Sequence, residues 1–275
     1  MLRRLVQIIW LLAVLLLLAL LTQTPQFKGV FKAVMPSDPA QLTESVINYP
    51  SPTQPDIFAY EPPAQGFQRY QFIFEDKARF FWMLSAQSGP AGKDPNASLP
   101  AAVLLLHGSL RDGRSMLDMW QKIAATGAVL IAPDSLDPAN WNLKNDGAAF
   151  QTAALAAALT ISPFDPDRVF LYGHSSGAIL ALELGNCTDL NVQKVAVHAG
   201  FFRGCAGWRK PIAHPYLIQT GDLDKTVPVQ DVRASAQLIA KKGSPIDLTI
   251  ILGHNHWYYH IGPTLAAQAW QFFQD

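Results

Sequence analysis

The chain has 275 residues, of which 49% are hydrophobic and 15% charged, and its 21 basic and 21 acidic side chains leave no formal net charge. That length fits one domain with a full hydrophobic core. The balanced charge gives no sign of attraction to nucleic acid or another polyanion, so no nucleic-acid partner is expected and local motifs must indicate the function.

A hydrophobic run follows Arg3 and Arg4 at the amino end. It extends from Leu5 to Leu21 and is interrupted only by Gln7. As a helix it would span roughly 25 Å, slightly less than a typical hydrocarbon core. The basic flank should stay cytoplasmic, which places the rest of the chain outside the cytoplasm. We interpret residues 1–22 as a signal anchor in the membrane or a cleaved signal peptide, which would make the protein membrane-anchored or secreted. The residues after Leu20 form a poor cleavage site, which favours the anchor.

Prolines dominate the next stretch. Eight of them lie in residues 23–66, which therefore read as an extended tether, because proline lacks a backbone donor and disfavours helix before it. Short apolar pieces such as Val46–Ile47 remain candidates for docking on the domain surface. Residues 67–275 are expected to form the catalytic domain.

Strand-length and helix-length segments then alternate along the chain. Aromatic-rich strands at 67–74 and 79–85 predict an antiparallel hairpin around Glu75–Lys77. Six apolar strands follow, at 101–106, 128–132, 168–172, 193–198, 215–220 and 246–251. Helices are predicted between and after them at about 115–126, 146–161, 176–186, 229–242 and 262–274. This alternation predicts an α/β domain with a mainly parallel, eight-stranded sheet and helices on both faces. The connection 199–214 is too short for a large lid domain.

The two cysteines, Cys187 and Cys205, are compatible with a disulfide in an exported protein. Cys187 follows a helix that descends to the amino edge of the sheet, whereas Cys205 follows a strand that rises to the carboxyl edge. The pair can meet only if the intervening loop turns back quickly, so the sequence does not decide whether the disulfide forms.

The strongest chemical signal is Gly173–His174–Ser175–Ser176–Gly177. This G-x-S-x-G follows the strand Val169–Tyr172 directly and precedes a helical run, the strand–turn–helix context that a nucleophile elbow requires. Such a turn lifts the serine above the sheet at a helix amino end, where a developing anion is favoured. Ser175 is therefore the predicted nucleophile.

A nucleophilic serine needs a base and an acid that orients the base. In this arrangement the chain order is serine, acid, histidine. The loop after strand 215–220 offers Asp224, which begins D-x-x-V-P before the next helix, with Asp222 as the alternative. The loop after the last strand offers His254 and His256, between which spacing alone does not decide. Alternate histidines can share a metal, but nothing nearby completes a ligand set, so no metal is expected.

Two backbone amides are needed to stabilise an oxyanion. Ser176, directly after the nucleophile, should supply one, and Ser109, in the loop His107–Gly108–Ser109 after strand 101–106, should supply the other. His107 is expected to brace this loop. Three tryptophans in loops on the same side are candidates for a substrate pocket, although packing under a loop is an equal alternative: Trp141, Trp208 and Trp257.

These residues resemble the polyhydroxybutyrate-depolymerase-like and feruloyl-esterase-like branch of the α/β-hydrolase superfamily. The matching segments are LLLHGS (104–109), NDGAAF (145–150), FDPDRVFLYGHSSGAILALEL (164–184), GDLDKTVP (221–228) and GHNHWYY (253–259). They cover roughly residues 101–275 in the expected order. In similar esterases the last loop has a histidine followed by a small or aromatic residue and tyrosines, which aligns with His256 and leaves His254 second.

The resemblance implies an α/β-hydrolase fold and a carboxylesterase that uses Ser175, Asp224 and His256 through an acyl-enzyme, without a cofactor. Its partners would be a small or polymeric ester and, through residues 1–22, a membrane. Two other functions stay open. One is a serine peptidase of the prolyl-oligopeptidase type, although the chain before residue 100 lacks that group's propeller. The other is a binding module that keeps the fold without the chemistry. Acyl and alcohol preference and oligomeric state are not indicated.

Overall fold

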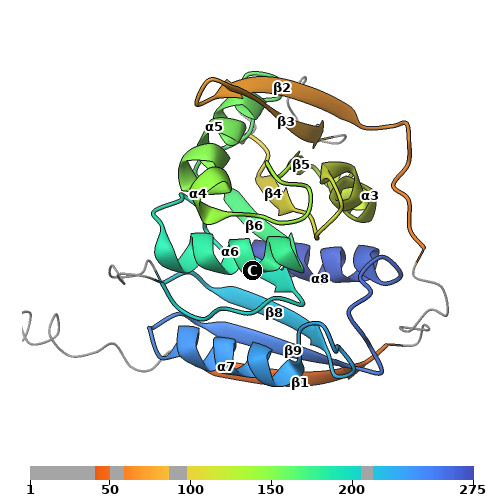
Figure 1. Ribbon diagram of the computed structural model, residues 1–275, viewed down its shortest axis with the longest axis vertical. Coiled ribbons are helices and arrows are strands. Elements are labelled where there is room, and N and C mark those ends of the chain that lie inside the picture. The colour runs from red at the N-terminus through yellow and green to blue at the C-terminus, as the bar shows by residue number, and fades with distance from the viewer. Residues whose placement is uncertain (1–40, 50–58, 87–97, 206–212) are drawn as a thin grey trace, which may run out of the picture. The chain divides into compact units, whose positions relative to one another are not determined.

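A nine-stranded sheet organises the part of the chain that the computed structural model describes, residues 41–49, 59–86, 98–205 and 213–275. The strand order is β1-β9-β8-β7-β6-β4-β5-β3-β2. Figure 1 shows the β2–β3 hairpin and strand β1 at opposite edges of the sheet. The described residues all belong to one compact unit, Ala40–Asp275.

Six parallel strands form the centre of the sheet. All neighbouring strands from β4 to β9 pair in parallel. Every residue of β4 to β8 is buried, which explains why their sequences are largely apolar runs. All six match predicted strands within a few residues. Their bounds are β4 Ala102–Leu106, β5 Val129–Pro133, β6 Val169–His174, β7 Val195–His198, β8 Tyr216–Gly221 and β9 Ile246–Leu252.

The predicted hairpin is present as β2, Gln68–Phe74, and β3, Lys77–Leu84, which pair antiparallel. Glu75 and Asp76 form its turn with φ angles of 49° and 59°. β3 also pairs antiparallel with β5, so the hairpin closes one edge of the sheet.

One strand corrects the sequence interpretation. Residues Leu42–Asn48 form β1, which pairs in parallel with β9, although they lie inside the range 23–66 assigned to an extended tether. The sheet therefore has nine strands rather than eight. Pro39 and Pro50 flank this segment without interrupting it, so its backbone donors are available to pair with β9. The other residues of 1–66 that belong to the predicted anchor and tether lie mostly outside the described ranges.

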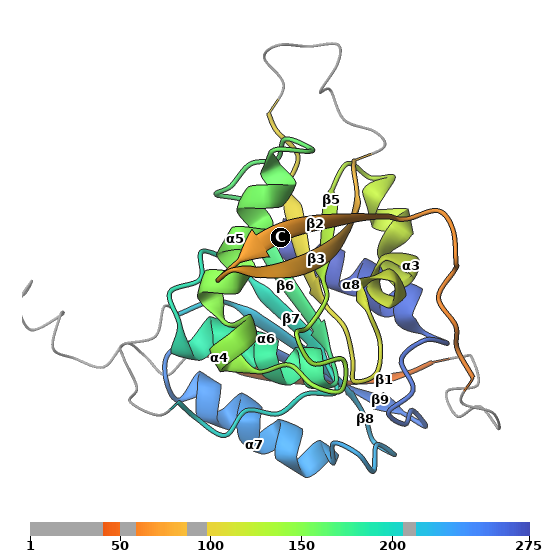
Figure 2. The ribbon, with the colours of Figure 1, turned by 45° about the horizontal axis from the view of Figure 1, so that its top comes forward.

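Helices cover both faces of the sheet, as predicted. Helices α3, Gly113–Ala124, and α8, Gly262–Gln274, pack in one apolar cluster. Helices α5, Ala148–Leu159, α6, Ser176–Cys187, and α7, Val229–Ala240, pack in a second cluster on the opposite face (Figure 2). A short helix, α4, Leu143–Asp146, precedes α5. Among the described residues no helix has the length and hydrophobicity to cross a bilayer.

Cys187 and Cys205 form a disulfide, with their Cα atoms 5.5 Å apart. The loop after β7 does turn back along α6: a Cβ on Gly200 would lie 2.5 Å from the Cβ of Ala178, near the start of that helix. Cys205 then reaches the last residue of the helix, Cys187. In the described part of 199–214 there is no helix or strand, in keeping with the expected lack of a large lid.

Candidate active site

Ser175 lies at the sharp turn between β6 and α6. Its backbone has φ 55° and ψ −119°, a conformation that costs free energy in a residue with a side chain and persists only where the surroundings impose it. Hydrogen bonds hold it on both sides: its N–H donates to the carbonyl of His198 at 3.0 Å, and its carbonyl accepts from the N–H of Ile179 at 3.0 Å.

The two glycines of the motif are required by close backbone contacts. A Cβ on Gly173 would lie 2.3 Å from the carbonyl oxygen of Gly177, and a Cβ on Gly177 would lie 2.3 Å from that of Leu106. Neither position can therefore hold a larger residue without moving the backbone. The G-x-S-x-G pattern thus has a steric cause in this turn.

Loops at the carboxyl ends of β8 and β9 bring two further side chains to Ser175. The Oγ of Ser175 lies 2.9 Å from Nε2 of His256, and Nδ1 of His256 lies 2.7 Å from Oδ2 of Asp224. With a neutral imidazole, Nδ1–H donates to the carboxylate and Nε2 accepts from the serine hydroxyl. The His256 side chain is 25% exposed, so it is accessible from solvent.

Asp224 is fixed in place by its own loop. Its Oδ1 accepts hydrogen bonds from the backbone N–H groups of Thr226 and Val227, both at 2.8 Å, while Oδ2 stays with His256. The carboxylate is buried. It is therefore held in one orientation facing the imidazole, which is what a base-orienting acid needs.

The alternative acid and base lie elsewhere. Asp222 accepts a hydrogen bond from the backbone N–H of Gly253 at 2.7 Å. His254 is buried, with its Nε2 3.0 Å from Nε2 of His198. The structure thus brings together Ser175, Asp224 and His256, the preferred set of the sequence analysis.

The predicted oxyanion loop borders the serine. A Cβ on Gly108 would lie 3.5 Å from the Cβ of Ser175, so this loop runs beside the predicted nucleophile. Ser176 is the first residue of α6, where backbone N–H groups point out of the helix without intrahelical partners. The loop that contains Ser109 and the start of α6, which contains Ser176, therefore both lie next to Ser175. The role of these two backbone N–H groups as oxyanion donors stays a prediction.

His107 braces this loop. Its Nδ1 hydrogen-bonds the carbonyl of Gly108 at 2.8 Å, and its Nε2 accepts from the backbone N–H of Ser135 at 3.2 Å. Burial lowers the pKa of His107, which favours the neutral ring that this pattern requires.

Three buried histidines form a hydrogen-bonded series that the sequence analysis did not predict. Nδ1 of His174 lies 3.0 Å from Nδ1 of His198, whose Nε2 contacts His254. Burial, together with repulsion from neighbouring histidines, holds the pKa of His174 and of His198 well below the usual value. When neutral, His198 donates at one nitrogen and accepts at the other, so the series ties β6, β7 and the loop after β9 together. Each of these histidines ends or follows a strand, but only the strand order shows that they meet.

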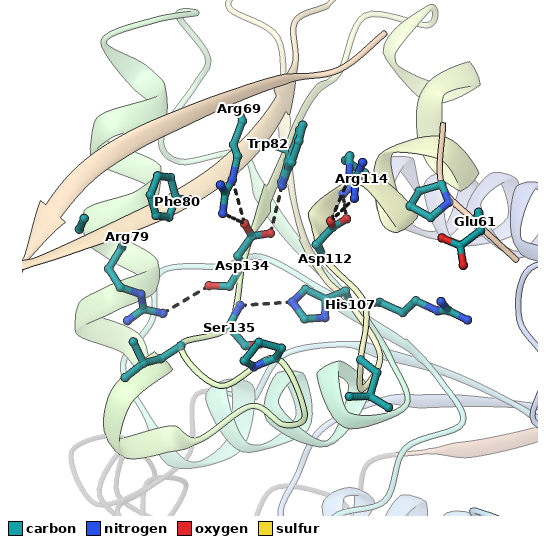
Figure 3. Close-up of a pocket in the computed structure, with 16 residues that line it drawn as sticks. Glu61, Arg69, Arg79, Phe80, Trp82, His107, Asp112, Arg114, Asp134 and Ser135 are labelled. Atoms are coloured by element: carbon teal, nitrogen blue, oxygen red, sulfur yellow. Dashed lines mark hydrogen bonds and ion pairs between the residues drawn. The ribbon is translucent and has the colours of Figure 1, made fainter. Parts of the chain in front are cut away.

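A cavity of about 740 Å³ lies along the other side of the oxyanion loop (Figure 3). His107, Leu110 and Arg111 of that loop line it, together with side chains of β3 and the loop after β5. Figure 3 shows Arg69 and Arg114 pointing toward Asp134 and Asp112, at 2.9 Å and 2.8 Å. No sequence pattern predicted this cavity, although the position of Arg111 just after the predicted loop was a usable signal.

Of the tryptophans predicted for a substrate pocket, Trp141 and Trp257 do not line this cavity. Trp141 donates from Nε1 to the carbonyl of His107 at 2.7 Å and packs against the His107 ring. Trp257 packs edge-on against Tyr259 and His260. Trp208 lies outside the described residues. Trp141 thus follows the alternative of packing on a loop, and the pocket role of Trp257 stays a prediction.

Comparisons with known proteins identify the fold. No protein-family model matches the chain, and no curated protein matches it in sequence. Among solved structures, esterase PE8 matches with a TM-score of 0.54 at 22% identity, over 70% of this chain and 97% of that one. S-formylglutathione hydrolase from Staphylococcus aureus matches with a TM-score of 0.61 at 13% identity, over 76% and 99%. Acylaminoacyl peptidase from Pyrococcus horikoshii matches with a TM-score of 0.58 at 12% identity, over 76% and 41%. These proteins share one architecture with the sheet described above, and the chain therefore has the α/β-hydrolase fold.

Proposed function

We propose that the chain is a serine hydrolase that cleaves carboxylic esters through an acyl-enzyme. The observation that carries this proposal is the continuous hydrogen-bonded line from Ser175 Oγ through His256 to Asp224, which opens to solvent at the serine and histidine. The fold and the esterases among the structural neighbours support it.

The geometry suggests the steps. His256 Nε2 takes the proton of Ser175 as Oγ attacks the ester carbonyl, and Asp224 holds the imidazole in the required tautomer and stabilises its charged form. Backbone N–H groups of Ser176 and Ser109 stabilise the tetrahedral oxyanion. His256 then protonates the departing alcohol. Water, deprotonated by the same imidazole, hydrolyses the acyl-enzyme and releases the acid. No step in this scheme calls for a cofactor.

The test compares the full-length chain with Ser175→Ala, both purified in detergent, on 4-nitrophenyl esters of short and long acids. Loss of the nucleophile should lower kcat/KM by at least ~10³-fold. Ser162→Ala, which removes a serine hydroxyl in the loop between α5 and β6, serves as the matched control. A Ser175→Ala chain as active as the wild type would overturn the proposal.

The two alternatives have their own readouts. The peptidase neighbour favours testing peptide 4-nitroanilides, although this chain covers only 41% of that longer protein. A fluorophosphonate probe should label the wild type and not Ser175→Ala, because it reacts with an activated serine. An unlabelled wild-type chain would favour the noncatalytic binding module.

We also propose that the catalytic domain acts outside the cytoplasm, attached to the membrane by residues 1–22 or released after their cleavage. The disulfide between Cys187 and Cys205 supports this location, because disulfides persist in oxidising compartments. Alkaline phosphatase fused after Asp275 should be active in intact cells, since that enzyme needs an oxidising environment, and an inactive but full-length fusion would contradict export.

A further inference from the structure

Arg111 stands between the predicted oxyanion loop and helix α3, at the edge of the cavity. The preceding residue, Leu110, is pinned by a hydrogen bond from its N–H to the carbonyl of Pro138 at 2.8 Å. The following residue, Asp112, is the N-cap of α3 and accepts from the N–H of Arg114 at 3.0 Å. The backbone of Arg111 is therefore fixed on both sides, three residues beyond the glycine that faces Ser175.

The other arginines that line the cavity each have a carboxylate partner. Arg69 pairs with Asp134 and Arg114 with Asp112, while Arg79 forms a buried ion pair with Asp146. Within each pair the positive and negative charges cancel, so these three arginines add no net charge to the cavity wall. Within the described ranges, no carboxylate lies within 4.0 Å of the Arg111 guanidinium, so this arginine leaves a positive charge at the cavity.

Aromatic rings hold the guanidinium of Arg111 in place. It lies 5.7 Å from the ring centre of Tyr60 and 5.4 Å from that of Tyr259, and these two rings stack at 3.9 Å. The hydroxyl of Tyr60 donates to Asp118 at 2.7 Å, which anchors the stack to α3. An arginine held by aromatic rings loses less conformational entropy when it binds an anion.

The charge of Arg111 is felt on the nucleophile side of the loop. It contributes to the low pKa of His174, the residue before Ser175, after the larger effects of burial and of His256. It also opposes the rise that burial produces in the pKa of Tyr259. The loop that borders Ser175 through Gly108 also carries Arg111, so a negative group bound to Arg111 would lie beside that same loop.

Three acidic side chains line the cavity: Asp112 and Asp134 are paired with arginines, so Glu61 is the one to be weighed against an anionic ligand. Glu61 is exposed to solvent, so water and salt screen its charge. Arg111 is half-buried on the cavity side of the oxyanion loop, where screening is weaker. The positive charge of Arg111 should therefore outweigh the negative charge of Glu61 for an anionic ligand.

We propose that this cavity is a substrate subsite for a carboxylate group, held by Arg111, so that the preferred substrates are esters carrying a free carboxylate near the scissile bond. This proposal rests on the proposed ester hydrolysis and names its substrate class. The planar guanidinium can bind both carboxylate oxygens at once, whereas a neutral ester offers it no opposite charge.

The test uses two substrates that differ in one charge, 4-nitrophenyl hydrogen succinate and its neutral methyl ester, 4-nitrophenyl methyl succinate. The wild-type chain should have the higher kcat/KM for the acid. Arg111→Gln should lower kcat/KM for the acid by about ten- to a hundredfold, since a charge-assisted hydrogen bond is lost, and leave the neutral ester within about twofold. Arg111→Lys should keep part of the preference for the acid, because lysine retains the positive charge but lacks the planar guanidinium that binds two carboxylate oxygens.

Glu61→Gln is the matched control, since it removes the opposite charge from the same cavity and should leave or raise the activity on the acid. Equal kcat/KM for the two esters in the wild type, or an equal loss on both in Arg111→Gln, would overturn the carboxylate subsite while the Ser175→Ala result still stood. Activity retained by Ser175→Ala on both esters would instead overturn the hydrolase proposal.

Binding without turnover gives a second readout. Monomethyl succinate should bind to the Ser175→Ala chain, and this binding should disappear when Arg111→Gln is added. Ligand-detected NMR at low and high salt measures both. Binding should weaken as ionic strength rises. Equal binding with and without Arg111 would contradict the subsite independently of any esterase activity.

Discussion

At the scale of single residues, two aspartates in one loop have different partners, although they are only two positions apart. Asp224 faces His256, whereas Asp222 accepts a backbone N–H from Gly253. Asp224→Asn would present an amide N–H₂ or a neutral oxygen to Nδ1 and would favour the wrong imidazole tautomer. We expect kcat to fall by roughly 10⁴-fold on 4-nitrophenyl esters while the fold is kept.

Asp222→Asn should lower kcat by no more than about tenfold, because the amide oxygen still accepts from Gly253 and the change in hydrogen-bond strength is small. The comparison is made on the same ester with circular dichroism of both variants as the control for folding. If the two variants lost activity equally, Asp224 would not be the orienting acid.

Residue positions in the candidate site were predictable where the chemistry imposes an order along the chain. Serine, acid and histidine each follow a strand of the parallel sheet, so their approximate places could be read from the strand pattern. The choice between His254 and His256 could not, because both follow the same strand and only the turn after β9 decides which ring faces Ser175. Arg111 and the histidine series depend on contacts across strands, which periodicity does not reveal.

At the scale of elements, a buried ion pair joins the β2–β3 hairpin to helix α4. Arg79 of β3 pairs with Asp146, whose carboxylate also accepts from the backbone N–H groups of Leu136 and Asn142, each at 3.0 Å. Asp146→Asn would leave the Arg79 charge buried without compensation. We expect the free energy of unfolding to fall by about 3 kcal/mol, measured by urea denaturation.

Glu44→Gln provides the comparison, because it breaks the pair with Arg233 that joins β1 to α7, where both side chains are more than a third exposed. Water screens that pair, so its loss should cost less than about 1 kcal/mol. If Asp146→Asn and Glu44→Gln had the same small effect, the cost of burying Arg79 and Asp146 would cancel their attraction.

Elements with strong apolar patterns were predicted closely, and β1 was not. Most of its seven side chains are exposed, and prolines surround it in sequence, so neither hydrophobic periodicity nor composition marks it as a strand. The backbone of β1 pairs with β9 along its full length. That pairing needs the free edge of β9, which exists only once the rest of the sheet has formed. Edge strands of this kind are where sequence patterns carry least information.

At the scale of the whole molecule, buried histidines link stability to pH. Burial lowers the pKa of His107, and burial with repulsion from neighbouring histidines lowers that of His174 and His198. In the unfolded chain these side chains take up protons near pH 6.5, whereas in the folded chain they do so only at lower pH. Below about pH 6.5 the unfolded chain therefore binds more protons, and the free energy of unfolding falls as the pH falls.

We expect stability to be highest above about pH 7 and to decline between pH 6.5 and 5, with each such histidine contributing up to about 1.4 kcal/mol for each pH unit. Urea denaturation at pH 7.5, 6.5 and 5.5 and constant ionic strength measures this slope. His198→Gln removes one titrating ring, so its slope should be shallower than that of the wild type even if the variant is less stable at every pH. A flat wild-type profile would mean that the folded chain protonates these histidines as readily as the unfolded one. A neutral hydrogen-bonded series would then be the wrong description of how β6, β7 and the loop after β9 are held together.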